Sequence, residues 1–448
     1  MRLLVLGGAI SGSAAARLGR RLGHSVTVYD QSAAVGAGLI GEGIGLVTGR
    51  WDPDLLTGVD LVVTSPGVPL RAAPITDARE AGAEVVSELE FGWRHLTAPI
   101  PQSQLIAVTG TNGKTTTTEA CTAMLAASGV AAAAVGNIGT PLSAVVGEPY
   151  EVLVAEVSSF QLEFTESFHP ATAVLLNIAP DHLDWHPSYT AYVDAKAKVI
   201  ANQVASDLLI FDADDPGVGP VTARARGRRH PVSGRSRPAG GSGPAAGALH
   251  LPGTSVPLTA LASNDPALLV DLTAAAVAAH DRGARPEALA EVCRRFRPGS
   301  HRRELVAIID DVAFVNDSKA TNPHAALASV SSFGSVVLIA GGLAKGLDVA
   351  PLATAPNVTH LIAIGTSAPV LLEAAGRGRA TEADSIEEAV ALAARMAEAG
   401  DTVLLAPGCA SFDMFTDYAA RGDAFVAAVK KLTGLTPGGA SSRPGGAA

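Results

Sequence analysis

A glycine-rich segment that ends in a lysine and two threonines is the strongest chemical signal in the sequence. Residues 108–116 read VTGTNGKTT, between an apolar run that predicts a strand and an Ala-rich stretch that predicts a helix. Amides at a helix N-terminus bind phosphate, a lysine placed there reaches the β- and γ-phosphates, and the next hydroxyl can bind Mg²⁺. We therefore expect an ATP site formed by Gly110, Thr111, Asn112, Gly113, Lys114, Thr115 and Thr116. The common pattern has a glycine where Val108 stands, so a plain glycine turn is the alternative interpretation.

Two later segments place acidic and histidine side chains after strands. Residues 155–163 read AEVSSFQLE, and Glu156 ends an apolar run, where a carboxylate near a P-loop can bind Mg²⁺. Residues 177–186 read NIAPDHLDWH, with His182 among carboxylates. A zinc hydrolase site is the alternative, but it would need further ligands and would leave the P-loop unused. Downstream, Lys196 lies on an expected helix, where an exposed lysine is the simplest interpretation.

Four polar segments in the last third open a domain or follow strands. They are GSHR at 299–302, NDSKATNP at 316–323, the glycine pair 341–342 with Lys345, and APGCASFD at 406–413. Any one of them could be a simple turn. Since ligands bind at the carboxyl ends of parallel strands, four such loops at one sheet edge predict a binding edge.

The N-terminus contains a second glycine-rich turn. GGAISG at 7–12 follows the first apolar run and Asp30 ends the second, which is similar to a dinucleotide-binding fingerprint. The third glycine position is occupied by Ser13 or Ala14, so the match is incomplete. An NAD(P)-dependent dehydrogenase is the alternative from another class, although hydride chemistry would leave the P-loop idle. A UDP group at the same helix N-terminus explains the glycines equally well.

The elements that must position these residues are short apolar runs alternating with Ala-rich stretches. This pattern is typical of α/β domains with buried parallel strands. At roughly 150 residues per domain, the 448 residues predict about three domains. Prolines near 98–101 and 297–299 mark the boundaries. We expect domains at 1–98, 99–297 and 298–433, followed by a disordered tail at 434–448.

Composition excludes several classes of protein. The net charge of −10 argues against general nucleic-acid binding, which needs a basic face. Three distant cysteines without a CxxC pair indicate a reduced, cytoplasmic compartment. No run of about 18 apolar residues exists, so we expect no membrane span. The opening MRLLVLGGAI is too short for a secretory signal and predicts a strand instead.

Taken together, these segments resemble the Mur ligase family. GTNGKTT, EVSSFQLE, APDHLD and the lysine that follows them form its central-domain pattern. SPG at 65–67, NDSKATNP and LLAPGCASFDMF at 404–415 are most similar to its D-glutamate-adding branch. The resemblance covers about residues 1–210 and 265–432, and omits the loop around 213–257. It implies a Rossmann-like UDP-binding domain, a central P-loop ATPase and a C-terminal Rossmann-like domain.

The activity that this resemblance implies is an ATP- and Mg²⁺-dependent ligation in peptidoglycan precursor synthesis. ATP would phosphorylate the L-alanine carboxylate of UDP-N-acetylmuramoyl-L-alanine, and the amine of D-glutamate would attack the acyl phosphate. Another Mur-type ligase or a folylpolyglutamate-type ligase is the alternative within this class. We expect a cytoplasmic monomer that binds these small molecules.

The resemblance also implies a role for individual residues. The UDP-linked substrate would lie along Ser11, Asp30, Gln31, Ser65, Gly67, Asn137, Ser158, Gln161 and His182. Thr115 and Glu156 would hold one Mg²⁺, with His182 and a carbamylated Lys196 at a second, and the catalytic set would be Lys114, His182 and Lys196. Arg302 and Asp317 would contact ADP, and D-glutamate would contact Lys319, Thr321, Lys345, Ser411 and Tyr418.

Two positions depart from the family pattern. The family often has an asparagine-bearing segment near the adenine pocket, where this chain reads ALLVD at 267–271. Relatives often have Phe at the position of Tyr418. The first departure leaves the adenine contacts open.

Overall fold

The computed structural model describes residues 1–32, 35–96 and 104–432. The expected linker around 98–101 and the expected disordered tail at 434–448 lie outside the described residues. The chain forms two compact units, one from Met1–Ala179 with Trp185–Arg297, and one from Pro180–Asp184 with the chain from Pro298 onward. The described part contains no helix that is long and apolar enough to cross a membrane.

The N-terminal part of the first unit is a parallel sheet in the order β3-β2-β1-β4-β5. Its strands are β1 (Arg2–Leu6), β2 (Ser25–Asp30), β3 (Gly45–Thr48), β4 (Leu61–Thr64) and β5 (Glu84–Ser87). Its helices are α1 (Ile10–Arg21), α2 (Ala73–Glu80), η1 (Ala37–Glu42) and η2 (Pro53–Leu56). The chain leaves β1 in one direction and returns to β4 on its other side, so the loops after β1 and β4 meet at the topological switch point.

The central sheet is also parallel, in the order β11-β10-β9-β6-β8-β7. Its strands are β6 (Leu105–Thr109), β7 (Ala132–Gly136), β8 (Val152–Glu156), β9 (Thr172–Leu175), β10 (Leu208–Asp212) and β11 (Arg228–Val232). Its helices are α4 (Lys114–Ala127), α5 (Ser159–Glu163), α6 (Tyr189–Ala197), α7 (Gly219–Thr222), α8 (Pro266–Asp281), α9 (Pro286–Arg295), η4 (Leu142–Ala144), η5 (Lys198–Ile200), η6 (Pro216–Val218) and η7 (Leu258–Ala260). A small antiparallel sheet is added by β12 (Gly243–Ala245), β13 (Ala248–Leu251) and β14 (Thr254–Pro257).

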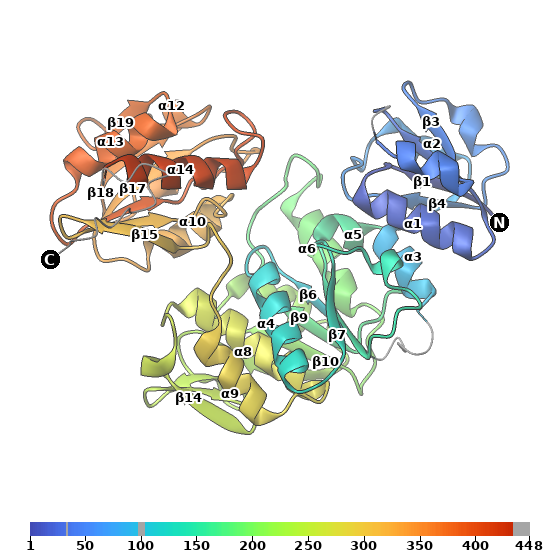
Figure 1. Cartoon of the computed structure of the whole chain (residues 1–448), viewed down its shortest axis with the longest axis horizontal. Helices are drawn as coiled ribbons and strands as arrows, with labels where there is room; N and C mark the ends of the chain where they lie inside the picture. The colour runs from blue at the N-terminus through green and yellow to red at the C-terminus, as the bar shows by residue number, and fades with distance from the viewer. Residues whose placement is uncertain (33–34, 97–103, 433–448) are drawn as a thin grey trace, which may run out of the picture. The chain divides into compact units, whose positions relative to one another are not determined.

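Burial on both faces explains the apolar strand sequences of the central sheet. Every residue of β6 and of β8 is buried, as in a parallel sheet with helices on both sides. Figure 1 shows α4 and α8 side by side over this sheet, and their apolar side chains form one cluster. The opposite face packs against a second cluster that includes Tyr192 and Val193 of α6. This double cover fixes the strand ends at which the loops emerge.

Helix α3 (Glu88–Arg94) carries two buried carboxylates and lies against the central sheet within the first unit. The Glu90 carboxylate accepts hydrogen bonds from the backbone N–H groups of Ser167 and Phe168, each at 2.9 Å. Glu88 Oε1 accepts one from Ser143 N at 2.6 Å, and burial raises the Glu88 pKa to about 7. These bonds attach the helix to its neighbours.

The second unit contains a six-stranded sheet in the order β15-β16-β20-β17-β18-β19. Its strands are β15 (Glu304–Ile309), β16 (Val312–Asn316), β17 (Val336–Gly341), β18 (Val358–Ile364), β19 (Ala380–Ala383) and β20 (Thr402–Leu405). Its helices are α10 (Pro323–Val330), α11 (Ala350–Ala353), α12 (Ala368–Ala375), α13 (Ile386–Met396) and α14 (Tyr418–Leu432). All pairs are parallel except β15 with β16. The switch point lies between β17 and β20, whose following loops carry Lys345 and Ser411.

Candidate active site

The P-loop follows β6 and enters α4 through Gly113, which has φ +84°. A Cβ on Gly113 would lie 2.3 Å from Asp271 Oδ1, so only glycine fits both the left-handed backbone and the space. Lys114 Nζ donates to the carbonyl oxygens of Gly110 at 3.0 Å and Thr111 at 2.8 Å. The loop therefore holds its lysine directly beside the amides that are suited to phosphate.

Asn177, which follows β9, supports the P-loop. Its Oδ1 accepts from Asn112 N at 2.8 Å, and its Nδ2 donates to Asn112 O at 3.1 Å. Its backbone carbonyl also accepts from Thr111 N at 2.9 Å. Asn177 was not predicted as a site residue, although an asparagine directly after a buried strand and before APDH was a usable signal.

Glu156 ends β8 and lies opposite Val108 of β6, which brings its carboxylate to the P-loop edge of the sheet. The side chain is buried, and Oε1 accepts from Asn137 Nδ2 at 2.9 Å. Among the described residues, Oε2 is buried with no hydrogen-bond partner. An unpaired buried carboxylate oxygen is costly, and a cation would remove that cost. Glu156 therefore fits a ligand of a divalent metal ion, and Thr115, on the first turn of α4, is half-buried.

Lys196 on α6 is only 2% exposed, so the interpretation as an exposed helical lysine is wrong. Its Nζ donates to Gly110 O at 2.8 Å and lies 4.7 Å from the centre of the Tyr192 ring. Lys198, two residues further on, donates to the carbonyl oxygen of Glu163 instead. The structure thus brings Lys196, and not Lys198, to the P-loop.

Ser158 and Gln161 form a capping box at the start of α5. Ser158 Oγ accepts from Gln161 N at 3.3 Å, and Gln161 Oε1 accepts from Ser158 N at 3.0 Å. Gln161 Nε2 is buried without an acceptor among the described residues, so this amide group can donate to a ligand. A contact of these residues with the UDP-linked substrate stays a prediction.

The N-terminal turn is held by Asp30 and Ser65. Asp30 Oδ2 accepts from Gly8 N at 2.8 Å, and Ser65 Oγ from the loop after β4 donates to Gly7 O at 3.3 Å. A Cβ on Gly12 would lie 1.7 Å from Gly7 O. The remaining residues that were predicted for this substrate end lie at the same strand edge and are half-buried or exposed: Ser11, Gln31 and Gly67.

Asp181 is the centre of a buried polar group in the second unit. Its Oδ1 accepts from Lys345 Nζ at 2.7 Å, and its Oδ2 accepts from Asn322 Nδ2 at 3.1 Å. His182 Nε2 lies 3.6 Å from Asp181 Oδ2. Burial opposes the charge of Asp181, but His182 and Lys345 hold its pKa below the ordinary value. Lys345, predicted to contact D-glutamate, is thus paired with a carboxylate of the chain itself.

The loops after β16 and β20 are joined by Arg421 of α14, which is 1% exposed. Its guanidinium donates to Ser318 O at 2.9 Å and to Cys409 O at 3.1 Å, and burial lowers its pKa to about 10. Lys319 Nζ lies 3.7 Å from the centre of the Tyr418 ring. Arg421 was not predicted from the sequence, because arginines are frequent in this chain and no motif marks this one.

The other residues predicted to contact ADP or D-glutamate in the second unit are buried or half-buried. Asp317 is buried, which raises its pKa, and its Oδ1 accepts from the backbone N–H of Arg303 at 3.2 Å. The neighbouring Arg302 is half-buried. Ser411 is buried and Thr321 is half-buried. Contacts of these residues with ADP or D-glutamate stay predictions.

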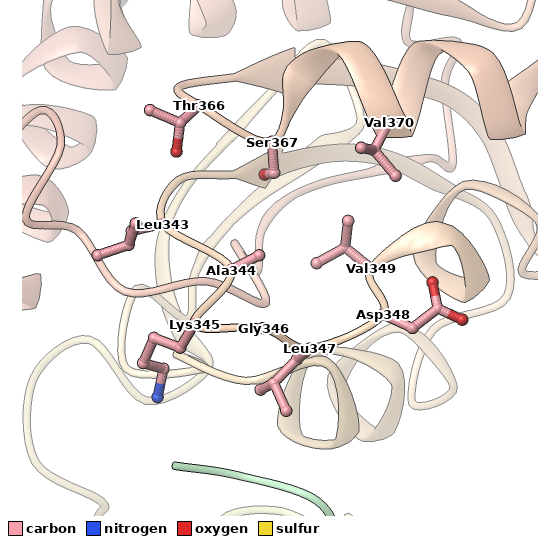
Figure 2. A pocket seen from close by; sticks show the side chains of 10 residues that line it. All are labelled: Leu343, Ala344, Lys345, Gly346, Leu347, Asp348, Val349, Thr366, Ser367 and Val370. Atoms are coloured by element: carbon pink, nitrogen blue, oxygen red, sulfur yellow. The ribbon is translucent and has the colours of Figure 1, made fainter. Parts of the chain in front are cut away.

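A cavity of about 360 Å³ lies at the carboxyl ends of β17 and β18 (Figure 2). It is lined by Leu343, Ala344, Lys345, Gly346, Leu347, Asp348, Val349, Thr366, Ser367 and Val370. In Figure 2 the Lys345 ammonium points away from the ring of lining side chains, in agreement with its bond to Asp181.

The described residues include no group of three or more His, Cys, Asp or Glu side chains that could hold a metal ion.

Three segments match protein-family descriptions. Residues 1–87 match the Mur ligase MurD-like N-terminal domain, residues 108–237 the Mur ligase middle domain, and residues 301–409 the Mur ligase glutamate ligase domain. The three matches follow the order of the three large sheets. The fold class predicted from the sequence, three α/β domains with mainly parallel sheets, is confirmed.

Solved structures with the same fold include a pseudomurein peptide ligase type C from Methanothermus fervidus, with TM-score 0.59, 18% identity and coverage of 96% of this chain and 100% of that chain. The MurF ligase from Thermotoga maritima in complex with ADP gives TM-score 0.59 at 14% identity, covering 91% and 95%. FolC from E. coli in complex with ADP gives TM-score 0.53 at 19% identity, covering 77% and 92%.

Curated relatives are closer in sequence. The UDP-N-acetylmuramoylalanine--D-glutamate ligase of Frankia casuarinae is 43% identical over 458 residues, covering 96% of this chain and 94% of that protein. The ligase of the same name from Trichlorobacter lovleyi is 40% identical, covering 96% and 98%. Similarity at this level over the whole length of both proteins shows common membership, and the chain belongs to the Mur ligase family.

Proposed function

We propose that this protein is an ATP-dependent, ADP-forming ligase that joins D-glutamate to the L-alanine carboxylate of UDP-N-acetylmuramoyl-L-alanine in peptidoglycan precursor synthesis. The observation that carries the proposal is the near full-length similarity to relatives that bear this name. The P-loop, with its lysine folded over the loop, supplies the ATP chemistry that such a reaction needs. A dehydrogenase would use only the N-terminal turn and would leave the P-loop without a role.

The chemistry follows from the weakness of a carboxylate as an electrophile. A carboxylate oxygen of the alanine attacks the γ-phosphorus of ATP, the bond to the bridging oxygen breaks, and ADP leaves. The free amine of D-glutamate then attacks the acyl carbon, and the tetrahedral intermediate expels inorganic phosphate with the C–O electron pair. The attacking nitrogen loses one of its two amine protons to phosphate or water, which leaves a neutral amide with one N–H. Lys114 offsets the negative charge that gathers on the phosphoryl oxygens.

The residues around the P-loop fit a divalent metal. Glu156 offers a buried, unpaired oxygen and Thr115 a hydroxyl on the first turn of α4, with Lys196 beside Gly110. His182 belongs to the second unit and is added to the proposed set on the family pattern alone. Bound Mg²⁺ would neutralise phosphate charge. Lys196 would bind as a carbamate, because an ammonium would repel the metal and a carbamate provides oxygen ligands. A carbamate nitrogen keeps one N–H, so the contact with Gly110 O is compatible with this form.

Each substrate has its own set of proposed contacts. The UDP-linked substrate uses the switch point of the N-terminal sheet, with Ser11, Asp30, Gln31, Ser65 and Gly67, and reaches Asn137, Ser158, Gln161 and His182. D-Glutamate uses Lys319, Thr321, Lys345, Ser411 and Tyr418, and ADP uses Arg302 and Asp317. Binding of D-glutamate at Lys345 requires its carboxylate to replace or share the bond that Asp181 now makes.

The proposal also includes the compartment, the oligomeric state and the domain boundaries of the enzyme. We infer a cytoplasmic monomer, and we place its domains at 1–98, 99–297 and 298–433 because prolines and glycines interrupt the chain near these boundaries. The acidic net charge of −10 suits small anionic substrates only where local cations, such as Lys114 and Lys319, are placed to receive them.

One assay tests the function against its alternatives. Phosphate release is measured with Mg·ATP, UDP-N-acetylmuramoyl-L-alanine and a panel of amino acids that includes both enantiomers of glutamate. We expect release only with D-glutamate. Release driven by another amino acid would indicate a different Mur ligase, and release with a pterin-type acceptor and L-glutamate would indicate a folylpolyglutamate-type ligase. Thermal protection by NAD(P) and not by ATP would indicate a dehydrogenase.

A further inference from the structure

Tyr192 on α6 contacts two residues that bear on the ATP site. It is 1% exposed, and its hydroxyl lies 2.9 Å from Thr111 Oγ1 of the P-loop. Its ring packs against the Lys196 side chain, with 4.7 Å between the ring centre and Nζ. Nothing in the sequence marked this tyrosine beyond its place four residues before Lys196.

The hydrogen bonds of Thr111 assign a direction to this contact. Thr111 Oγ1 donates to Ala179 O at 3.1 Å and accepts from Ala179 N at 2.9 Å. A threonine hydroxyl has one proton and two acceptor lone pairs. Because that proton goes to the Ala179 carbonyl oxygen, the Tyr192 O–H is the donor to Thr111. The Thr111 hydroxyl then uses its one proton and both of its lone pairs in hydrogen bonds.

The same turn of α6 also contacts Gly110, the P-loop residue before Thr111. Lys196, four positions after Tyr192 and so on the same helix face, donates to Gly110 O at 2.8 Å. Two side chains of one helical turn therefore contact Gly110 and Thr111, in addition to the support that Asn177 gives to Asn112. All of these residues belong to the first unit.

We propose that Tyr192 is a positioning residue of the ATP site: its hydroxyl fixes Thr111, and its ring holds the Lys196 side chain against the P-loop. The inference deepens the proposed ligase function and rests on it only for the turnover assay. The P-loop amides must be oriented before ATP arrives, and a buried hydrogen bond restricts them at low entropic cost. In this proposal Tyr192 acts through Thr111 and Lys196 and not through a contact of its own with a substrate.

The hydroxyl is tested by Tyr192→Phe, which keeps the ring over which Lys196 lies. We expect the dissociation constant of Mg·ATP, measured by calorimetry without the other substrates, to rise about tenfold. The KM for the UDP-linked substrate should stay within about twofold of wild type, since a single hydrogen bond contributes on the order of a tenfold effect where it acts. The melting temperature should fall by no more than about 3 °C.

Three matched variants make the test specific. Tyr189→Phe on the same helix removes a hydroxyl that donates to Ile178 O at 3.0 Å, and it should bind Mg·ATP like wild type. In a Thr111→Val background, Tyr192→Phe should have less than about a twofold further effect, because its partner is already gone. Thr111→Ser, which keeps the hydroxyl, should retain the full effect of Tyr192→Phe.

The outcomes separate this inference from the proposed function. Three outcomes would each overturn the positioning role. The first is that Tyr192→Phe binds Mg·ATP like wild type, and the second is that its effect is additive in the Thr111→Val background. The third is an equal loss of affinity for every substrate together with a large fall in melting temperature. Failure of wild type to release phosphate with D-glutamate would overturn the ligase function, and the calorimetric result for Tyr192 would still stand.

Discussion

The turn after β1 and the P-loop after β6 occupy the same place in two parallel sheets, and they carry opposite charge. Each leaves the carboxyl end of a strand and begins a helix beside a glycine that has no room for a Cβ: Gly12 in the first turn of α1 and Gly113 at the N-cap of α4. In the P-loop the charged side chain is Lys114, which donates to the loop carbonyls. In the N-terminal turn it is Asp30, which accepts from the Gly8 amide.

Glycine geometry thus makes a helix N-terminus accessible, whereas the neighbouring charge selects the ligand. A cation beside backbone amides suits a triphosphate. A carboxylate that already occupies one amide would repel a phosphate at that point, and it suits a ligand that presents hydroxyl or N–H donors. Variants at the two turns test this contrast, beginning with the one for which we expect the largest effect.

Removing the cation should have the largest effect. We expect Lys114→Ala to lower kcat by on the order of 10²–10³, because a preorganised charge beside the phosphoryl oxygens is lost. Circular dichroism should show an intact fold, since Lys114 is only half-buried. If Lys114→Ala turned over within about tenfold of wild type, the assignment of this segment as the ATP-binding P-loop would be wrong. The contrast between the two turns would then also fail.

Lys196→Ala tests the second lysine at the P-loop. The variant should be nearly inactive, and millimolar formate or acetate should restore part of the activity by supplying the oxygen ligand that a carbamate would provide. Lys198→Ala is the control, because Lys198 contacts the Glu163 carbonyl and not the loop. Full activity of Lys196→Ala, or restoration by chloride as well as by formate, would contradict the carbamate.

Gly12→Ala tests the geometry of the N-terminal turn without changing its charge. The new Cβ would lie 1.7 Å from Gly7 O, so the turn must shift, and we expect the KM for the UDP-linked substrate to rise more than about tenfold. The KM for ATP should be almost unchanged. Gly41→Ala, where a Cβ meets nothing within 4 Å, serves as the matched control. If the KM values for both substrates rose together, the two turns would not act on separate ligands.

Asp30→Asn should have the smallest effect of the series. The amide oxygen can keep one of the bonds to Gly8 N or Ser32 N, while the charge and the second acceptor are lost. Because one bond is retained and a typical hydrogen bond contributes about 0.5–1.5 kcal/mol net, we expect a several-fold change in the KM for the UDP-linked substrate. Steady-state kinetics at saturating ATP measures it, and an equal change in the KM for ATP would contradict a local role.

Local patterns in the sequence were sufficient for the strand, loop and helix at 105–127, because phosphate loops require a fixed order of glycine, lysine and threonine along a few residues. The parallel α/β class was also predictable, since strands buried on both faces are uniformly apolar. The linker and tail predictions fall on residues outside the described ranges and stay predictions. The residue contacts proposed for D-glutamate and ADP also stay predictions.

The order of the short motifs and the class of fold can therefore be read from the sequence alone. Which motifs meet depends on the tertiary structure, because the sheet order places β8 and β9 on either side of β6 and so brings Glu156 and Asn177 to the P-loop. The burial of Lys196 and the bonds by which Arg421 joins two loops also appear only in the folded chain. The spacing of residues along the chain does not predict these contacts, because they depend on strand order and on which helix face packs inward.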